Sequence, residues 1–169
     1  MAGFAERMVR AARLDVALYE EVEADKGAMG QATGVVVLSS LAAGVGVIGH
    51  VGTEGIFWGT VAALVSWYIW AFLTYIIGTK VLPEPQTRAD MGELLRTIGF
   101  STSPGLIRVL GIIPFLTPIV FLIAAIWMLV AMVIAVRQAL DYKGTGRAVA
   151  VCVIGWIVQG LILAVLVRV

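Results

Sequence analysis

The stretch Leu82–Pro104, LPEPQTRADMGELLRTIGFSTSP, is the longest polar interruption in a sequence that is otherwise strongly apolar. Two apolar runs precede it, at 32–49 and 56–79. A long apolar block follows it and is broken only by Pro114, Pro118 and a polar patch at 137–147. The runs approach the ~20 residues that a helix needs to cross the hydrocarbon core of a bilayer. The stretch therefore predicts a polar connector between two groups of membrane helices.

Composition sets the class of protein. Hydrophobic residues make up 60% of the chain and charged residues 14%, whereas soluble domains carry about 45–50% and about 25%. The 169 residues suffice for four or five membrane segments with short connections, so we expect a single membrane domain over 1–169. The 12 Lys and Arg nearly balance the 11 Asp and Glu, which leaves no basic face for nucleic acid. The single cysteine, Cys152, excludes an internal disulfide and a multi-thiolate metal site.

Residues 3–26 predict an amphipathic N-terminal helix. Apolar residues recur at spacings of three and four, and the other face is basic early in the segment and acidic late. Such a helix lies along the membrane surface or packs on the body of the protein. Its acidic half disfavours anchoring to anionic lipid, so we expect docking onto the protein's own cytoplasmic face or onto a partner.

The first expected span, 32–49, is rich in small residues. Gly30/Gly34, Ser40/Gly44 and Ala42/Gly46 are small residues four apart, a spacing that lets another helix approach closely. The segment His50–Gly55 is expected to be a tight turn into the second span, 56–79. His50 and Glu54 in this turn are too few to form a metal site.

Four tryptophans fall near the middle of their apolar runs: Trp67, Trp70, Trp127 and Trp156. Tryptophan is usually enriched at the membrane interfaces instead. We expect these indoles to share one intramembrane cluster, which either packs helices together or lines a pocket for a lipid, quinone or pigment.

The stretch 82–103 is expected to be a cytoplasmic amphipathic connector. Pro83 and Pro85 end the second span, and 87–100 then places apolar and charged residues on opposite sides of a short surface helix. Basic and acidic residues of this connector and of the patch at 137–147 are expected to pair or to meet a partner. They are Glu84, Arg88, Asp90, Glu93, Arg96, Arg137, Asp141 and Arg147.

The apolar block after the connector decides the topology. Read as segments at 104–116, 119–136 and 148–167, with a turn at Pro114–Pro118, it places the Lys and Arg of the N-terminal segment, the connector and the last loop on one side of the membrane. The positive-inside tendency favours that arrangement. We therefore predict an all-α integral membrane protein with five membrane helices, the third short and paired with the fourth. The N-terminus is expected in the cytoplasm and the C-terminus outside.

Four segments carry a resemblance to a known family: LDVALYEEVEAD (14–25), LPEPQTRADMGELLRTIGFSTSPGLIRVLG (82–111), WMLVAMVIAVRQALDY (127–142) and RAVAVCVIGW (147–156). They resemble the bacterial and archaeal branch of the Yip domain family. The resemblance implies a five-span protein of a prokaryotic cell membrane. Eukaryotic relatives belong to the early secretory pathway, where they bind Rab-type GTPases and recruit trafficking factors. The family has no established catalytic motif to carry over.

Function is expected to be non-enzymatic, with no cofactor. A scaffold, membrane-organising or accessory subunit would bind a protein partner or a second copy through the charged cytoplasmic face, with membrane lipid around it. The alternative is a small-molecule, lipid or ion carrier, because transport sites need polar groups or broken helices inside the bilayer. Its candidate elements are Arg108, the Pro114–Pro118 break and Gln159.

Overall fold

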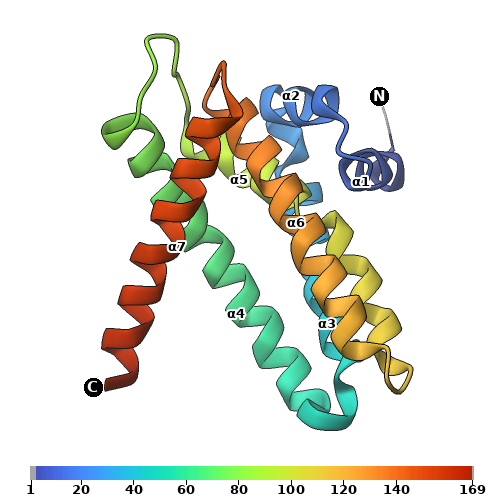
Figure 1. Ribbon diagram of the computed structural model, residues 1–169. Coiled ribbons are helices and arrows are strands. Elements are labelled where there is room, and N and C mark those ends of the chain that lie inside the picture. Colours follow the sequence, from blue (N-terminus) through green and yellow to red (C-terminus); the bar gives the residue numbers. More distant parts are fainter. Residues whose placement is uncertain (1–2, 169) are drawn as a thin grey trace.

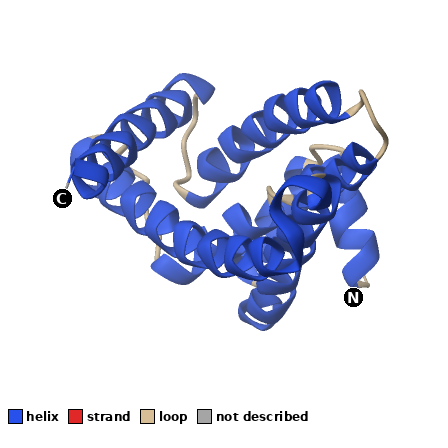
Figure 2. Cartoon of the chain, turned by 90° about the horizontal axis from the view of Figure 1, so that it is seen from below, coloured by secondary structure: helices blue, strands red, loops and turns tan. Residues whose placement is uncertain are grey.

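The computed structural model describes the backbone of residues 3–168 and the side chains of residues 3–161, and every regular element in that part of the chain is helical (Figures 1 and 2). Short 3₁₀ or π segments carry the label η. In chain order the elements are α1 (Phe4–Ala12), α2 (Val16–Ala24), η1 (Lys26–Ala28), α3 (Met29–Gly46), α4 (Ile48–Ile76), η2 (Ile77–Val81), α5 (Met91–Phe100), η3 (Ser103–Ile112), α6 (Thr117–Ala139) and α7 (Thr145–Arg168).

Three helices are long and apolar enough to cross a membrane: Lys26–Gly46, Ile48–Val81 and Thr117–Ala139. Thr145–Leu161 forms a shorter apolar helix within the described side chains. The 3₁₀ segment η3 has 10 residues and, at a rise of about 2.0 Å per residue, extends roughly 20 Å. This is less than the ~30 Å thickness of a bilayer core.

The N-terminal segment is two helices rather than the single helix expected over 3–26. The chain turns at Leu14, which has a φ of 61°. The helix α2 then starts at Val16, and the side chain of its N-cap Asp15 accepts a hydrogen bond from the Ala17 N–H. An N-cap aspartate satisfies a free N–H at the start of a helix, so α2 begins anew there. The break folds α2 back beside α1.

The connection between the first two long helices also differs from the expected turn at His50–Gly55. The chain breaks at Val47, where α3 ends, and again at Gly52, which has a φ of 63° and interrupts α4. Glycine adopts this left-handed backbone without the penalty of a Cβ. His50 and Glu54 therefore belong to the first turns of α4.

The helix α5 is buried, whereas the sequence predicted a surface helix. All seven residues from Leu94 to Phe100 are buried, because α2, α3, α4 and α6 all pack against α5. A Cβ added at Gly99 would lie 2.8 Å from the Cβ of Ala32 on α3, so glycine permits this close crossing. Of the side expected to face water, Arg88 and Asp90 are exposed, whereas Arg96 is buried with the rest of Leu94–Phe100.

The predicted close approach of small residues on the first span is found at Gly44 and Gly46, whereas a Cβ added at Gly30 would meet no atom within 4 Å. A Cβ added at Gly44 would lie 2.9 Å from Ile56 of α4, and one added at Gly46 would lie 2.1 Å from the backbone oxygen of Arg108 in η3. Small residues let helix backbones touch where no side chain would fit. The start of α4 and the segment η3 are both fitted against α3 in this way.

The two ends of the molecule differ (Figure 1). The helices α1 and α2, the loop 82–90 and the loop 140–144 gather at one end. The α3–α4 connection and the turn at 113–116 lie at the other end, as does the C-terminal end of α7. Within the segments 47–55 and 113–116 at the other end, Glu54 is the one charged residue. We call that first end the polar face.

Candidate functional site

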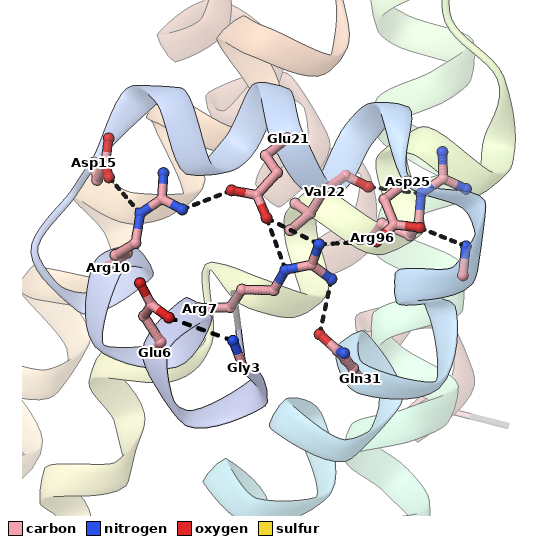
Figure 3. Close-up of polar contacts among 11 residues, drawn as sticks. Gly3, Glu6, Arg7, Arg10, Asp15, Glu21, Val22, Asp25, Gln31 and Arg96 are labelled. Carbon is pink, nitrogen blue, oxygen red and sulfur yellow. Dashed lines mark hydrogen bonds and ion pairs between the residues drawn. The ribbon is translucent and has the colours of Figure 1, made fainter. Parts of the chain in front are cut away.

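The helices α1 and α2 are joined on the polar face by a network of charged side chains (Figure 3). Arg7 is only 4% exposed, and its guanidinium donates to Glu21 (2.9 Å), Asp25 (2.9 Å) and Gln31 (3.0 Å). Arg10 pairs with Asp15 at 2.7 Å and with Glu21 at 2.6 Å. Because a buried arginine is tolerated only when it is fully paired, these contacts fix α1 on α2 and on the start of α3.

The network also sets the protonation of its acids. A hydrogen bond from Arg10 lowers the pKa of Glu21 and of Asp15, and a hydrogen bond from Arg7 lowers the pKa of Asp25. Donors that bind the charged form of a carboxyl group favour that form. The three acids are therefore held ionised, and the sequence prediction had assigned none of them a role.

Arg96 joins α5 to the end of α2. Its side chain is 4% exposed, its Nε donates to the carbonyl of Val22 at 2.8 Å, and its Nη2 donates to the carbonyl of Glu23. These carbonyls belong to the last turn of α2, where the backbone lacks partners within the helix and carries partial negative charge. Arg96 thus acts as a cap for α2 from inside the protein.

The loops 82–90 and 140–144 are bound to each other. Glu84 pairs with Arg147 at 3.3 Å and accepts a hydrogen bond from the Lys143 N–H at 3.2 Å. The Gln86 side chain donates to the Asp141 carbonyl at 2.9 Å. The Tyr142 hydroxyl donates to the carbonyl of Leu82 at 2.9 Å. The two loops therefore form one surface, joined mostly through backbone groups.

Most of the side-chain pairs expected between the charged residues of this surface are not formed. Arg96 binds α2 carbonyls, and Arg137 binds the carbonyls of Tyr142 (3.3 Å) and Lys143 (3.2 Å). Asp90 and Glu93 cap α5 reciprocally, a common use of acids at a helix start. Among the described residues the one ion pair of the predicted set is Glu84–Arg147. Arg88 contributes its backbone N–H, 3.4 Å from Asp141 Oδ2.

An acidic cleft opens between α2 and these loops. Its volume is about 720 Å³, and four carboxylates from three parts of the chain line it: Glu20, Glu23, Glu93 and Asp141. Arg137 is the basic residue in the lining. Burial, together with the charges of Asp141, Glu93 and Glu20, raises the pKa of Glu23 to about 7. The cleft is thus a concentration of negative charge.

The four predicted tryptophans do not form one cluster. The rings of Trp70 and Trp156 lie 6.4 Å apart, and the Trp67 indole donates to the Leu95 carbonyl at 3.0 Å. These three tryptophans line one cavity, which is distinct from the acidic cleft. Trp127 instead donates to the carbonyl of Ala12 at 2.7 Å and so holds α6 against the end of α1. The free carbonyl of Ala12 at the end of α1 thus binds the Trp127 indole, which the sequence predicted to lie in the intramembrane cluster.

That cavity has a volume of about 550 Å³ and lies among α3, α4, η3, α6 and α7. Its walls are mostly apolar, and Arg108 and Gln159, the two carrier candidates, both line it. Within the described part of the chain, no group of three or more His, Cys, Asp or Glu side chains is placed to hold a metal ion.

Long apolar helices that meet in a charged face at one end define an integral multi-pass membrane protein. A comparison with known protein families matches the Yip1 domain over residues 19–167. The chain therefore belongs to the Yip1 domain family, whose members are generally non-enzymatic membrane trafficking proteins. Searches of curated proteins and of solved structures gave no match.

Proposed function

We propose that this protein is a non-enzymatic membrane scaffold whose polar face binds a partner protein, with a positively charged segment of the partner in the acidic cleft. The observation that carries the proposal is the convergence of four carboxylates in one cleft of about 720 Å³. Complementary charge steers a basic segment toward such a surface and selects against acidic partners.

The rigidity of the polar face supports the same role. Arg7, Arg96 and the bound loops join α1, α2, α5 and the segments around Glu84 and Asp141. A surface that is already ordered loses little conformational entropy when a partner binds. The face is therefore suited to docking another protein.

The charge distribution supports a cytoplasmic position for this face. Lys and Arg cluster there, and the described residues at the other end, at 47–55 and 113–116, contain neither. Under the positive-inside tendency, we propose five membrane segments, with the N-terminus in the cytoplasm, the C-terminus outside and η3 as a short third segment. We further propose that the protein belongs to the prokaryotic branch of the family and lies in the cell membrane.

The test compares two double variants. Glu20→Gln with Asp141→Asn removes two charges from the cleft, and asparagine tolerates the positive φ of 53° at position 141. Glu6→Gln with Glu54→Gln removes two charges outside the lining of the cleft. Each protein is purified from its native membrane in mild detergent, and the associated proteins are identified by mass spectrometry.

The proposal expects one partner to be recovered with wild type and with the Glu6/Glu54 variant but to be strongly reduced with the Glu20/Asp141 variant. Cross-links should join the cleft to a segment of that partner rich in Lys or Arg. Equal recovery with both variants, or cross-links that avoid the cleft, would contradict it.

A carrier role is the second candidate, favoured by the cavity that Arg108 and Gln159 line. Polar groups inside a membrane bundle often mark a transport path. If solute flux into proteoliposomes fell in variants of both residues, the carrier role would be favoured over the scaffold role.

A further inference from the structure

The cavity among α3, α4, η3, α6 and α7 has a charged group in an apolar setting. Its volume of about 550 Å³ falls within the ~300–1,000 Å³ of ligand sites. Trp70 reaches from α4 to α6, where its Nε1 donates to the Met132 sulfur at 3.2 Å, and Trp156 of α7 packs beside Trp70. These side chains form an aromatic part of the cavity wall, and Arg108 lines the same cavity.

Arg108 is held in place by neutral groups. Its Nε donates to the Gly105 carbonyl at 3.0 Å, and its Nη2 donates to the carbonyl (3.0 Å) and the hydroxyl (2.7 Å) of Ser39 on α3. A Cβ at Gly105 would lie 2.7 Å from Arg108 Nη2 and 2.3 Å from Ser39 Oγ. Gly105 therefore leaves the space in which the guanidinium lies.

This arrangement leaves both the charge and two donors of Arg108 without a protein partner among the described residues. No described carboxylate lies within ion-pair distance of Arg108, and none of the hydrogen bonds of its side chain uses Nη1. No buried side-chain nitrogen in the described part of the protein lacks a partner, so Nη1 is an accessible atom of a residue that lines the cavity. An uncompensated arginine inside a membrane bundle is costly and marks a functional site.

We propose that the cavity binds one anionic phospholipid, with its phosphate on Arg108 and its apolar part along the wall of Trp70 and Trp156. A guanidinium with two free N–H groups matches a phosphate, and such charge-assisted bonds are strong. Ser40, Thr102 and Gln159 also line the cavity and supply polar groups for the rest of the head group. This site is separate from the acidic cleft and does not depend on the scaffold role.

The test uses the full chain in vesicles of equal parts phosphatidylglycerol and phosphatidylcholine, followed by mild extraction and native mass spectrometry. We expect wild type to retain one phosphatidylglycerol per protein, and Arg108→Gln to lower the retained fraction about tenfold, the factor that corresponds to about 1.4 kcal/mol. Arg88→Gln, at an exposed arginine of the polar face, is the matched control and should retain the lipid.

A second variant leaves Arg108 intact. Gly59 lines the cavity, and a Cβ there would meet no atom within 4 Å, so Gly59→Leu adds an apolar group to the cavity lining at a position with open space. Gly160 also has open space around it but does not line the cavity, which makes Gly160→Leu the matched control. We expect the lipid to be lost from Gly59→Leu and kept by Gly160→Leu.

Equal retention of phosphatidylcholine and phosphatidylglycerol by wild type would overturn the proposal, as would retention of no lipid. Unchanged retention in Gly59→Leu would also overturn it, and this result remains decisive even if Arg108→Gln does not fold. Loss of the lipid from both Gly59→Leu and Gly160→Leu would indicate a general weakening of the bundle and count against the site.

Discussion

The polar face and the membrane half of this protein are built in opposite ways. The largest fully buried side chains gather near the polar face: Tyr19, Phe100, Leu18, Leu94, Ile98 and Leu140. In the membrane half, large apolar side chains point outward, with Trp58 66% exposed and Leu161 62% exposed. The protein thus has a packed core at its polar end and a looser group of helices in its membrane half.

The contrast follows from the two solvents. At the polar end, water drives apolar side chains together. In lipid that drive is absent between helices, and association depends on close packing and hydrogen bonds. The membrane half accordingly uses glycine contacts such as Gly46 with η3. It also leaves open a cavity of about 550 Å³. Perturbing each half in turn tests this division.

The largest effect is expected at the polar end from Arg96→Gln. The substitution leaves the carbonyls of Val22 and Glu23 buried without their charged donor, and each unsatisfied group costs about 1–3 kcal/mol. We expect the free energy of unfolding to fall by about 3–4 kcal/mol, measured by circular dichroism in mixed SDS micelles. Arg88→Gln, at an exposed arginine, should change it by less than about 0.5 kcal/mol. A similar effect of both variants would show that Arg96 does not cap α2.

The next effect is expected in the membrane half from Gly46→Ala. The added Cβ would lie 2.1 Å from the Arg108 carbonyl oxygen, a backbone atom that cannot turn away. Overpacking of this kind costs about 1–3 kcal/mol, measured in the same micelles. In Gly30→Ala the added methyl group meets no atom within 4 Å, so this variant of the same helix should be neutral or slightly stabilising. Equal stability of the two variants would argue against the contact between α3 and η3.

Glu23 makes the polar end sensitive to pH. Its pKa of about 7 in the folded protein, against an ordinary 4.5, means that the folded state binds this proton more tightly than the unfolded chain. Its contribution to stability therefore falls as pH rises from about 4.5 to about 7, and the full penalty applies above pH 7. Arg96 opposes the effect, while Asp141, Glu93 and Glu20 add to it.

We therefore expect Glu23→Gln to be more stable than wild type at pH 8, by roughly 1–2 kcal/mol, and to gain little at pH 4. The measurement is the unfolding midpoint at both pH values. Glu54→Gln, at the opposite end, controls for the loss of one negative charge. An equal gain at pH 4 and pH 8 would show that Glu23 is ionised as readily in the fold as in the unfolded chain.

The smallest effect is expected where the two halves meet, at Trp67. Trp67→Phe removes the hydrogen bond from the indole Nε1 to the Leu95 carbonyl and should cost about 1 kcal/mol in the same unfolding measurement. Trp58→Phe changes an indole that is 66% exposed and should be neutral. A neutral result for both would mean that Trp67 does not join α4 to α5.

The sequence predicted features that depend on spacing along one element. The apolar runs, the small residues of α3 and the start of the third segment near Ser103–Pro104 all follow from local pattern. The structure has helices over the apolar runs, although the first break falls at Val47 rather than at His50–Gly55. The capacity of Asp15 to cap a helix was a usable signal for the break between α1 and α2. That break would have suggested that Arg7 and Arg10 face Glu21 and Asp25.

The partners of individual side chains were not predictable in the same way. Arg96 binds carbonyls of α2 that are 74 and 73 residues away along the chain, and Trp127 binds the Ala12 carbonyl 115 residues away. All three acceptors are backbone carbonyls at the ends of helices, and residue type does not reveal where such free groups lie. The burial of α5 likewise depends on four helices converging on it, so its charged residues suggested a surface position.

The most direct test of the scaffold account is site-specific photo-crosslinking in native membranes from Ala24. This residue lines the acidic cleft and is exposed, so a photoreactive side chain there disturbs no contact of the network. The account predicts cross-links from Ala24 to one protein, at a segment rich in Lys or Arg, and none to that protein from Thr53 at the opposite end. Cross-links from Ala24 to lipid alone, or the same protein captured from both positions, would contradict it.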